Sequence, residues 1–134
     1  MQTVALIIVT ASGLWLVVVS FLMALRPRYC LRLFEKMASN LAASSWRLNL
    51  TEQGLRIVAG AALIVRSPLS KLPLTFEAAG WCIVISSLLI LALPMRWHAS
   101  YGHWWSRWLT PSVLRVLSPM PAIVGAGIVY AAAV

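Results

Sequence analysis

An uncharged run of 22 residues, 4–25 (VALIIVTASGLWLVVVSFLMAL), constrains the fold of this chain more than any other feature. A helix of that length rises about 33 Å, which is enough to cross a bilayer hydrocarbon core of about 30 Å. The run has no basic segment before it and no small-residue cleavage site, so it predicts a membrane span and not a signal peptide.

Three further segments extend the prediction to four spans. Residues 74–93 and 113–134 are long apolar runs, whereas 55–65 (LRIVAGAALIV) is short. If Thr51 caps this short helix and Arg66 snorkels at its far end, it has about 15 residues and rises about 23 Å. A re-entrant or interfacial segment is the alternative. We therefore expect an all-α, integral membrane four-helix bundle that forms a single domain over 1–134.

The basic residues are unevenly placed along a chain with a net charge of +8. The connection between the first two spans holds Arg26, Arg28, Arg32, Lys36, Arg47 and Arg56. The connection between the last two spans holds Arg96, Arg107 and Arg115. The middle loop holds only Arg66 and Lys71. Positive charge favours the cytoplasmic side, so both basic loops are expected there and both termini outside, in a bacterial inner membrane. Nucleic acid is not an expected partner, because the Trp-rich stretch is tethered between spans and the basic residues are too few for a binding groove.

The two halves of the chain resemble each other. Residues 50–58 (LTEQGLRIV) and 109–117 (LTPSVLRVL) match at an offset of 59, and ALRPRYC at 24–30 parallels ALPMRWH at 92–98. The matches predict a duplication, with repeat one over about 4–66 and repeat two over about 74–134. Because an even number of spans precedes the second copy, the two repeats are expected to be parallel hairpins.

The matched segments also predict how two of the helices begin. Thr51 and Thr110 are expected N-caps, Pro111 fits the first helical position, and Glu52 suits the first turn of its helix. Arg56 and Arg115 would then lie at headgroup depth, just over one turn into each span.

These segments, ALRPRYC…LTEQGLRIVAGAALIV and ALPMRWH…LTPSVLRVLSPMPAIVGAGIVY, carry a resemblance to a known group. Each unit resembles small uncharacterised bacterial inner-membrane proteins built as a helical hairpin. The resemblance implies two tandem hairpin units that cover nearly the whole chain, and it implies no activity and no site residues.

Both connections predict amphipathic helices lying on the cytoplasmic membrane surface. In 96–108 (RWHASYGHWWSRW), aromatic residues recur at 4-3-4 spacing, and a basic face lies opposite them. The first connection has a weaker apolar stripe of Cys30, Phe34, Met37 and Leu41. Contacts with anionic lipid headgroups or a partner are expected at Arg28, Arg56, Arg96, Trp97, Tyr101, Trp104, Trp108, Arg107 and Arg115.

The sequence offers little material for catalysis or cofactor binding. His98 and His103 diverge by about 140° on a helix, so a shared metal ion is not expected, nor is any other cofactor. Glu77, close to the start of the third span, is a candidate transport carboxylate that otherwise faces water or pairs with Arg66 or Lys71. Small residues at 59–62 and 122–131 permit close helix approach, and Pro119 and Pro121 should bend the last helix.

The expected function is therefore that of a non-catalytic accessory or assembly subunit of a larger membrane complex, or of a homo-oligomer, in contact with lipid. One alternative is a small transporter or channel, with Glu77, Arg66 and Arg56 lining a path. A further alternative is a membrane enzyme that acts on a lipid or hydrophobic substrate at the Trp-rich face.

Overall fold

The computed structural model describes residues 1–43 and 46–133, and the side chains at 37–43, 46, 48, 95, 98 and 99 lie outside that description. These side chains include those of Met37 and Leu41, which belong to the predicted apolar stripe, and that of His98. The described chain is helical, as predicted. Its elements are α1 (Gln2–Leu25), α2 (Pro27–Ala43), α3 (Trp46–Arg66), η1 (Ser67–Leu69), α4 (Pro73–Ala92), α5 (Met95–Trp108), α6 (Pro111–Leu117) and α7 (Pro119–Ala132).

Three helices of the described chain are long and apolar enough to cross a membrane: α1, α4, and α6 with α7 as one segment, Pro111–Ala132. These three helices coincide to within a few residues with the predicted spans 4–25, 74–93 and 113–134. The fourth predicted span is not among them. Helix α3 has 21 residues and rises about 31 Å, but Arg47, Glu52 and Arg56 lower its hydropathy.

The predicted start of α3 at Thr51 is wrong. Thr51 lies in the second turn of the helix, where its Oγ1 donates to the carbonyl oxygen of Arg47 at 2.9 Å. Glu52 is likewise in the second turn and not in the first. In the second copy, Thr110 does cap α6, because its side chain accepts from the Val113 N–H at 3.3 Å.

The different outcome for the two threonines has a local cause. Pro111 follows Thr110, and a proline disfavours helical geometry in the residue before it, so the helix begins there. No proline follows Thr51, and the helix continues upstream to Trp46.

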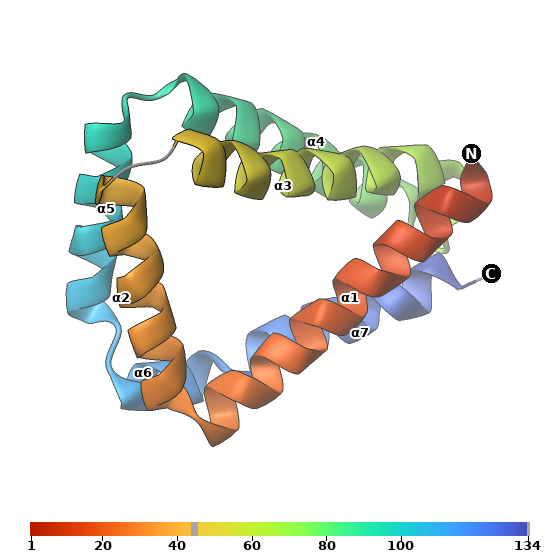
Figure 1. Ribbon diagram of the computed structural model, residues 1–134. Helices are drawn as coiled ribbons and strands as arrows, with labels where there is room; N and C mark the ends of the chain where they lie inside the picture. Colours follow the sequence, from red (N-terminus) through yellow and green to blue (C-terminus); the bar gives the residue numbers. More distant parts are fainter. Residues whose placement is uncertain (44–45, 134) are drawn as a thin grey trace.

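The long helices form two antiparallel pairs, α1 with α7 and α3 with α4 (Figure 1). The two pairs meet at the end that carries both termini and η1, and they diverge toward the other end, where α2 and α5 lie side by side. A single four-helix bundle is therefore not confirmed. The main helix contacts also join the two predicted repeats, whereas the predicted hairpins would pair α1 with α3 and α4 with α7.

Each pair is held by a close contact between two glycines. A Cβ atom added to Gly13 would stand 2.8 Å from the carbonyl oxygen of Gly125, and one added to Gly60 would stand 2.9 Å from that of Gly80. Contacts this short leave no room for a side chain, so each pair packs backbone against backbone. The prediction that small residues permit close approach is confirmed for Gly60 and Gly125.

The hydrophobic core lies where the two pairs meet. Its buried members come from α1, α3, α4 and α7, and they are Ala5, Val9, Ala62, Leu63, Phe76, Ala131 and Ala132. Hydrogen bonds tie the same end together: Gln2 Nε2 donates to the Val65 carbonyl at 3.0 Å, and Arg66 Nη2 donates to the Ala132 carbonyl at 3.0 Å.

The last helix is interrupted at Ser118, between α6 and α7, directly before the first of the two prolines that predicted a bend. Pro119 has no N–H, so the Arg115 carbonyl loses its usual helical donor. Ser118 replaces that donor with its hydroxyl, at 2.7 Å, and with its own N–H, at 3.3 Å. The Ser118 carbonyl in turn accepts a hydrogen bond from the buried Ser20 hydroxyl of α1.

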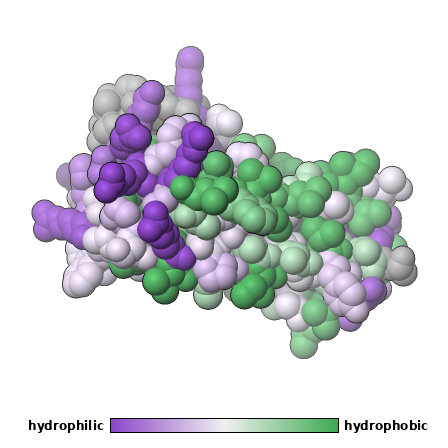
Figure 2. Space-filling view, turned by 90° about the horizontal axis from the view of Figure 1, so that it is seen from below, coloured by the Kyte–Doolittle hydropathy of each residue, from purple (hydrophilic) through white to green (hydrophobic). Residues whose placement is uncertain are grey.

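Polar and apolar surface are separated along the molecule. Figure 2 shows hydrophilic side chains gathered at the end that carries α2, α5 and α6, and hydrophobic side chains over the middle of the molecule. This separation, together with the three apolar helices, is what a chain embedded in a membrane needs.

Candidate functional site

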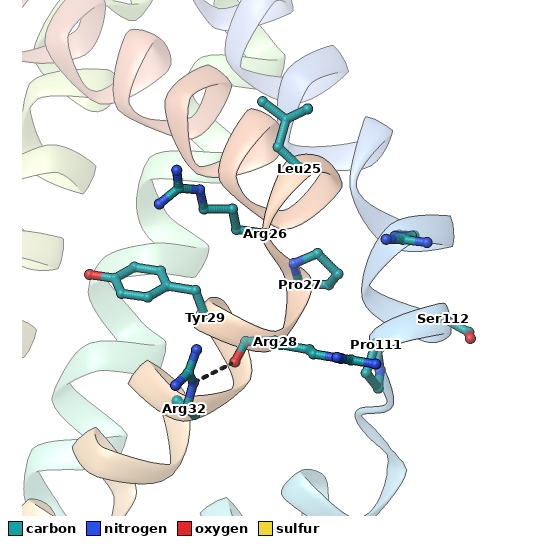
Figure 3. Close-up of a pocket in the computed structure, with 9 residues that line it drawn as sticks. Leu25, Arg26, Pro27, Arg28, Tyr29, Arg32, Pro111 and Ser112 are labelled. Atoms are coloured by element: carbon teal, nitrogen blue, oxygen red, sulfur yellow. Dashed lines mark hydrogen bonds between the residues drawn. The ribbon is translucent and has the colours of Figure 1, made fainter.

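Four arginines line one pocket at the corner between α1, α2 and α6 (Figure 3). This arginine pocket has a volume of about 730 Å³, and its lining residues are Leu25, Arg26, Pro27, Arg28, Tyr29, Arg32, Pro111, Ser112 and Arg115. It lies at the hydrophilic end of the molecule, directly beyond the last residue of the apolar helix α1.

The corner arises from the residues that end α1 and begin α2. Arg26 leaves helical geometry, with φ −133° and ψ 60°, while its N–H still donates to the Leu22 carbonyl at 2.8 Å. Pro27 then begins α2, where its missing N–H costs no hydrogen bond. Arg28 and Arg32 follow one turn apart on α2, and Figure 3 shows Arg28 extending toward α6 while the Arg26 and Arg32 side chains lie on the other side of the corner.

Arg28 extends from α2 across to Pro111 at the start of α6, as Figure 3 shows. Arg32 Nε donates to the Arg28 carbonyl oxygen at 3.4 Å. The pocket thus combines the end of α1, two turns of α2 and a helix about ninety residues further along the chain.

The charge in the arginine pocket is not compensated by the residues that line it. None of its lining residues is acidic. Within the described chain, Glu52 pairs with Arg56 on α3 at 2.9 Å, while Glu35 and Glu77 are exposed on α2 and α4. The pocket is therefore a concentrated positive charge at the edge of the apolar surface.

A second cavity, also of about 730 Å³, lies between the two helix pairs. This wedge cavity is lined by Val9, Ala11, Ser12, Trp15, Leu16, Glu52, Leu55, Arg56, Ala59, Leu63, Ile83, Ser86 and Ile128. Most of these side chains are apolar, and the Glu52–Arg56 ion pair sits on one wall. Two charged groups in such a wall are tolerated because they neutralise each other.

The matched segments 50–58 and 109–117 align Arg56 with Arg115, but the two arginines line different cavities. Arg56 precedes Gly60 by four residues and Arg115 precedes Gly125 by ten, which are rises of about 6 Å and 15 Å. Arg56 is thus much closer to the glycine contact of its helix pair. Arg56 is the eleventh residue of α3, so the prediction that it lies just over one turn into its helix is wrong, whereas Arg115, the fifth residue of α6, lies as predicted.

The aromatic residues of the second connection form an exposed surface on α5. Trp97, Tyr101, Trp104 and Trp108 are each more than half exposed. Trp105 joins them through edge-on ring contacts, with centroids 6.0 Å from Tyr101 and 5.3 Å from Trp104. Arg96 and Arg107 are exposed on the same helix but do not line the arginine pocket.

The predicted site residues are thus distributed over several places. Arg28 and Arg115 come together with Arg26 and Arg32, two residues that the sequence had not singled out as contacts. The candidate transport residues do not gather: Arg56 lines the wedge cavity, Arg66 is buried against the end of α7, and Glu77 is exposed on α4. Lys71 lies over the Tyr130 ring, with 4.0 Å between its Nζ and the ring centroid.

Metal ligands do not cluster in the described part of the chain, where no three His, Cys, Asp or Glu side chains come together. The chemistry that the four guanidinium groups of the arginine pocket offer is recognition of anions. No protein-family model, no curated protein and no solved structure matches the chain.

Proposed function

We propose that this chain is a non-catalytic accessory or assembly subunit of a larger membrane complex in a bacterial inner membrane. In this proposal all four long helices cross the bilayer, both termini lie outside, and α2 and α5 lie on the cytoplasmic surface. The basic end contacts anionic lipid headgroups, and the helix faces contact other integral membrane subunits.

The wedge cavity carries the proposal. Trp15 and Leu55, on facing walls of the cavity, remain 64% and 68% exposed within the isolated chain. The tight glycine contacts fix the helix pairs that form these walls, so the cavity does not close by a simple shift of one helix. An apolar wall that bears one neutralised ion pair suits a membrane helix that offers a polar group to that pair.

The low self-burial of the long helices supports the same proposal. The most apolar windows of α1, α4 and the α6–α7 segment are 22%, 17% and 17% buried inside the chain. Most of their apolar surface is therefore left for lipid or for neighbouring subunits.

A tandem duplication also remains our proposal, in a register different from that of the LR motifs. In each glycine contact one glycine comes from the first span of a repeat and the other from a second span. The first-span glycines, Gly13 and Gly80, are 67 residues apart, and the second-span glycines, Gly60 and Gly125, are 65 residues apart. Buried Ser20 and Ser87 share the first of these offsets. These equivalences support two copies in which the first span of each copy pairs with the second span of the other, α1 with α7 and α4 with α3.

The test is site-specific photo-crosslinking in intact membranes. A photoreactive residue at position 55 should form an adduct with one membrane protein that also co-purifies in stoichiometric amount in mild detergent. The matched control is position 123, because Ile123 is 70% exposed but does not line the wedge cavity. Adducts with lipid alone at position 55, or the same adducts at both positions, would contradict the proposal.

A further inference from the structure

We propose that the arginine pocket is a binding site for a ligand that carries two phosphate groups. The inference rests on the proposed function to the extent that it takes the pocket to lie at the membrane surface. It goes further by naming one site and one chemical class, whereas a basic surface in general attracts any anionic lipid.

The arginines of the pocket have unused hydrogen-bond donors. A guanidinium offers five N–H donors in a planar fork that matches two oxygens of a phosphate. Of the four pocket arginines, Arg32 uses its Nε on the Arg28 carbonyl. Within the described residues, the side chains of Arg26, Arg28 and Arg115 make no hydrogen bond or ion pair, so their forks are available to a ligand.

Arg115 lacks the ion-pair partner that Arg56 has. Arg56 is neutralised by Glu52, four residues before it on the same helix face. The residue four before Arg115 is Pro111, which holds no charge and begins α6. Arg115 is therefore left with its full charge, and it faces a pocket that already contains three arginines.

The four arginines of the pocket carry more positive charge than one phosphodiester balances. One phosphodiester carries a single negative charge and would leave three of the four arginines uncompensated. Two phosphate groups supply at least two negative charges, and the forks that could receive them lie on two sides of the corner, Arg26 and Arg32 on one side and Arg28 on the side of α6 (Figure 3). A volume of about 730 Å³ lies within the range of small-molecule pockets, about 300–1,000 Å³, so such a group fits.

Two sources could supply this chemistry: a phospholipid with two phosphates, or a soluble diphosphate. The experiment reconstitutes the full chain in phosphatidylcholine nanodiscs and titrates four probes: cardiolipin, phosphatidylglycerol, phosphatidic acid and inorganic pyrophosphate. We expect cardiolipin to bind at least about tenfold more tightly than phosphatidylglycerol, because each charge-assisted hydrogen bond contributes about 1.5–3 kcal/mol. Phosphatidic acid should fall between the two.

The variants separate a built site from diffuse charge. R115Q and R28Q should reduce the preference for cardiolipin to within about threefold, whereas R96Q and R107Q remove the same charge from α5 and should leave it unchanged. R115K keeps the charge but loses the planar fork, so its preference should lie between that of R115Q and that of the unaltered chain.

The two sources are distinguished by competition. Cardiolipin that stays bound in millimolar pyrophosphate identifies a membrane headgroup, and displacement by micromolar pyrophosphate identifies a soluble diphosphate. Equal affinity for cardiolipin and phosphatidylglycerol together with no binding of micromolar pyrophosphate, or an equal loss in R107Q and R115Q, would overturn the proposal. Neither result would alter the adduct at position 55, so failure of this site and failure of the proposed subunit role are distinguishable.

Discussion

Gly13 of α1 and Gly125 of α7 lie backbone to backbone, with only 2.8 Å between the carbonyl oxygen of Gly125 and the place where a Gly13 side chain would begin. The same position is also 2.8 Å from a methyl group of Val129. The Gly60–Gly80 contact repeats this arrangement between α3 and α4, where a Cβ atom on Gly60 would meet Val84 at 2.9 Å. The two helix pairs therefore depend on four positions that tolerate no side chain.

We expect Gly13→Ala and Gly60→Ala each to lower the free energy of unfolding by about 1–3 kcal/mol, because the added methyl group forces the paired helices apart. Gly127→Ala and Gly54→Ala are matched controls, since a Cβ atom at either position meets nothing within 4 Å. The controls should be neutral or slightly stabilising, because alanine favours the helix. Unfolding in mixed detergent micelles measures the difference. Equal losses of stability in the two substitutions and in the two controls would refute the glycine contacts.

The Ser20 hydroxyl should add a smaller stabilisation to the α1–α7 pair. It is buried and donates to the Ser118 carbonyl at the break between α6 and α7. Ser20→Ala is expected to cost about 0.6–1 kcal/mol, the usual value of such a bond between membrane helices. Ser86→Ala is the control, because the Ser86 hydroxyl is exposed and bonds the Ile83 carbonyl of its own helix. The same unfolding assay should show no loss for the control.

Glu52 and Arg56 should be energetically coupled. Glu52→Leu leaves Arg56 without its partner on the wall of the wedge cavity, whereas the double change to leucine removes both charges. The single variant should therefore be less stable in bilayers than the double variant, with a coupling energy of about 1 kcal/mol. A double-mutant cycle provides the measurement. Additive effects would show that the pair is fully solvated and that the cavity is open to water.

The span boundaries were predictable, but the helix pairing was not. Long apolar runs, uncharged in α1 and with a single charged residue each in α4 and the last span, define these three spans without reference to any partner. The sequence LTEQ resembles a helix start, yet without a following proline it did not prevent α3 from beginning at Trp46. Small residues mark a helix face that another helix can approach closely, but they do not identify that helix. The pairing of α1 with α7 and of α3 with α4 could therefore be seen only in the structure.

The arginine pocket shows the same limit. Arg28 and Arg115 could be singled out because each lies next to a proline or within a repeated motif. Arg26 and Arg32 acquire their role from the sharp corner at Pro27 and from contact with α6, far along the chain. Neither relationship leaves a local signal in the sequence.

The most direct test of the central claim, that four helices cross the membrane, is labelling with an impermeant maleimide. Leu69→Cys in η1 and His103→Cys in α5 are placed singly in a chain whose Cys30 and Cys82, both free thiols, are replaced by serine. We predict that position 69 is labelled in intact spheroplasts and that position 103 is labelled only after permeabilisation. If α3 does not cross, the pattern is reversed, and labelling of position 103 without permeabilisation would contradict the account.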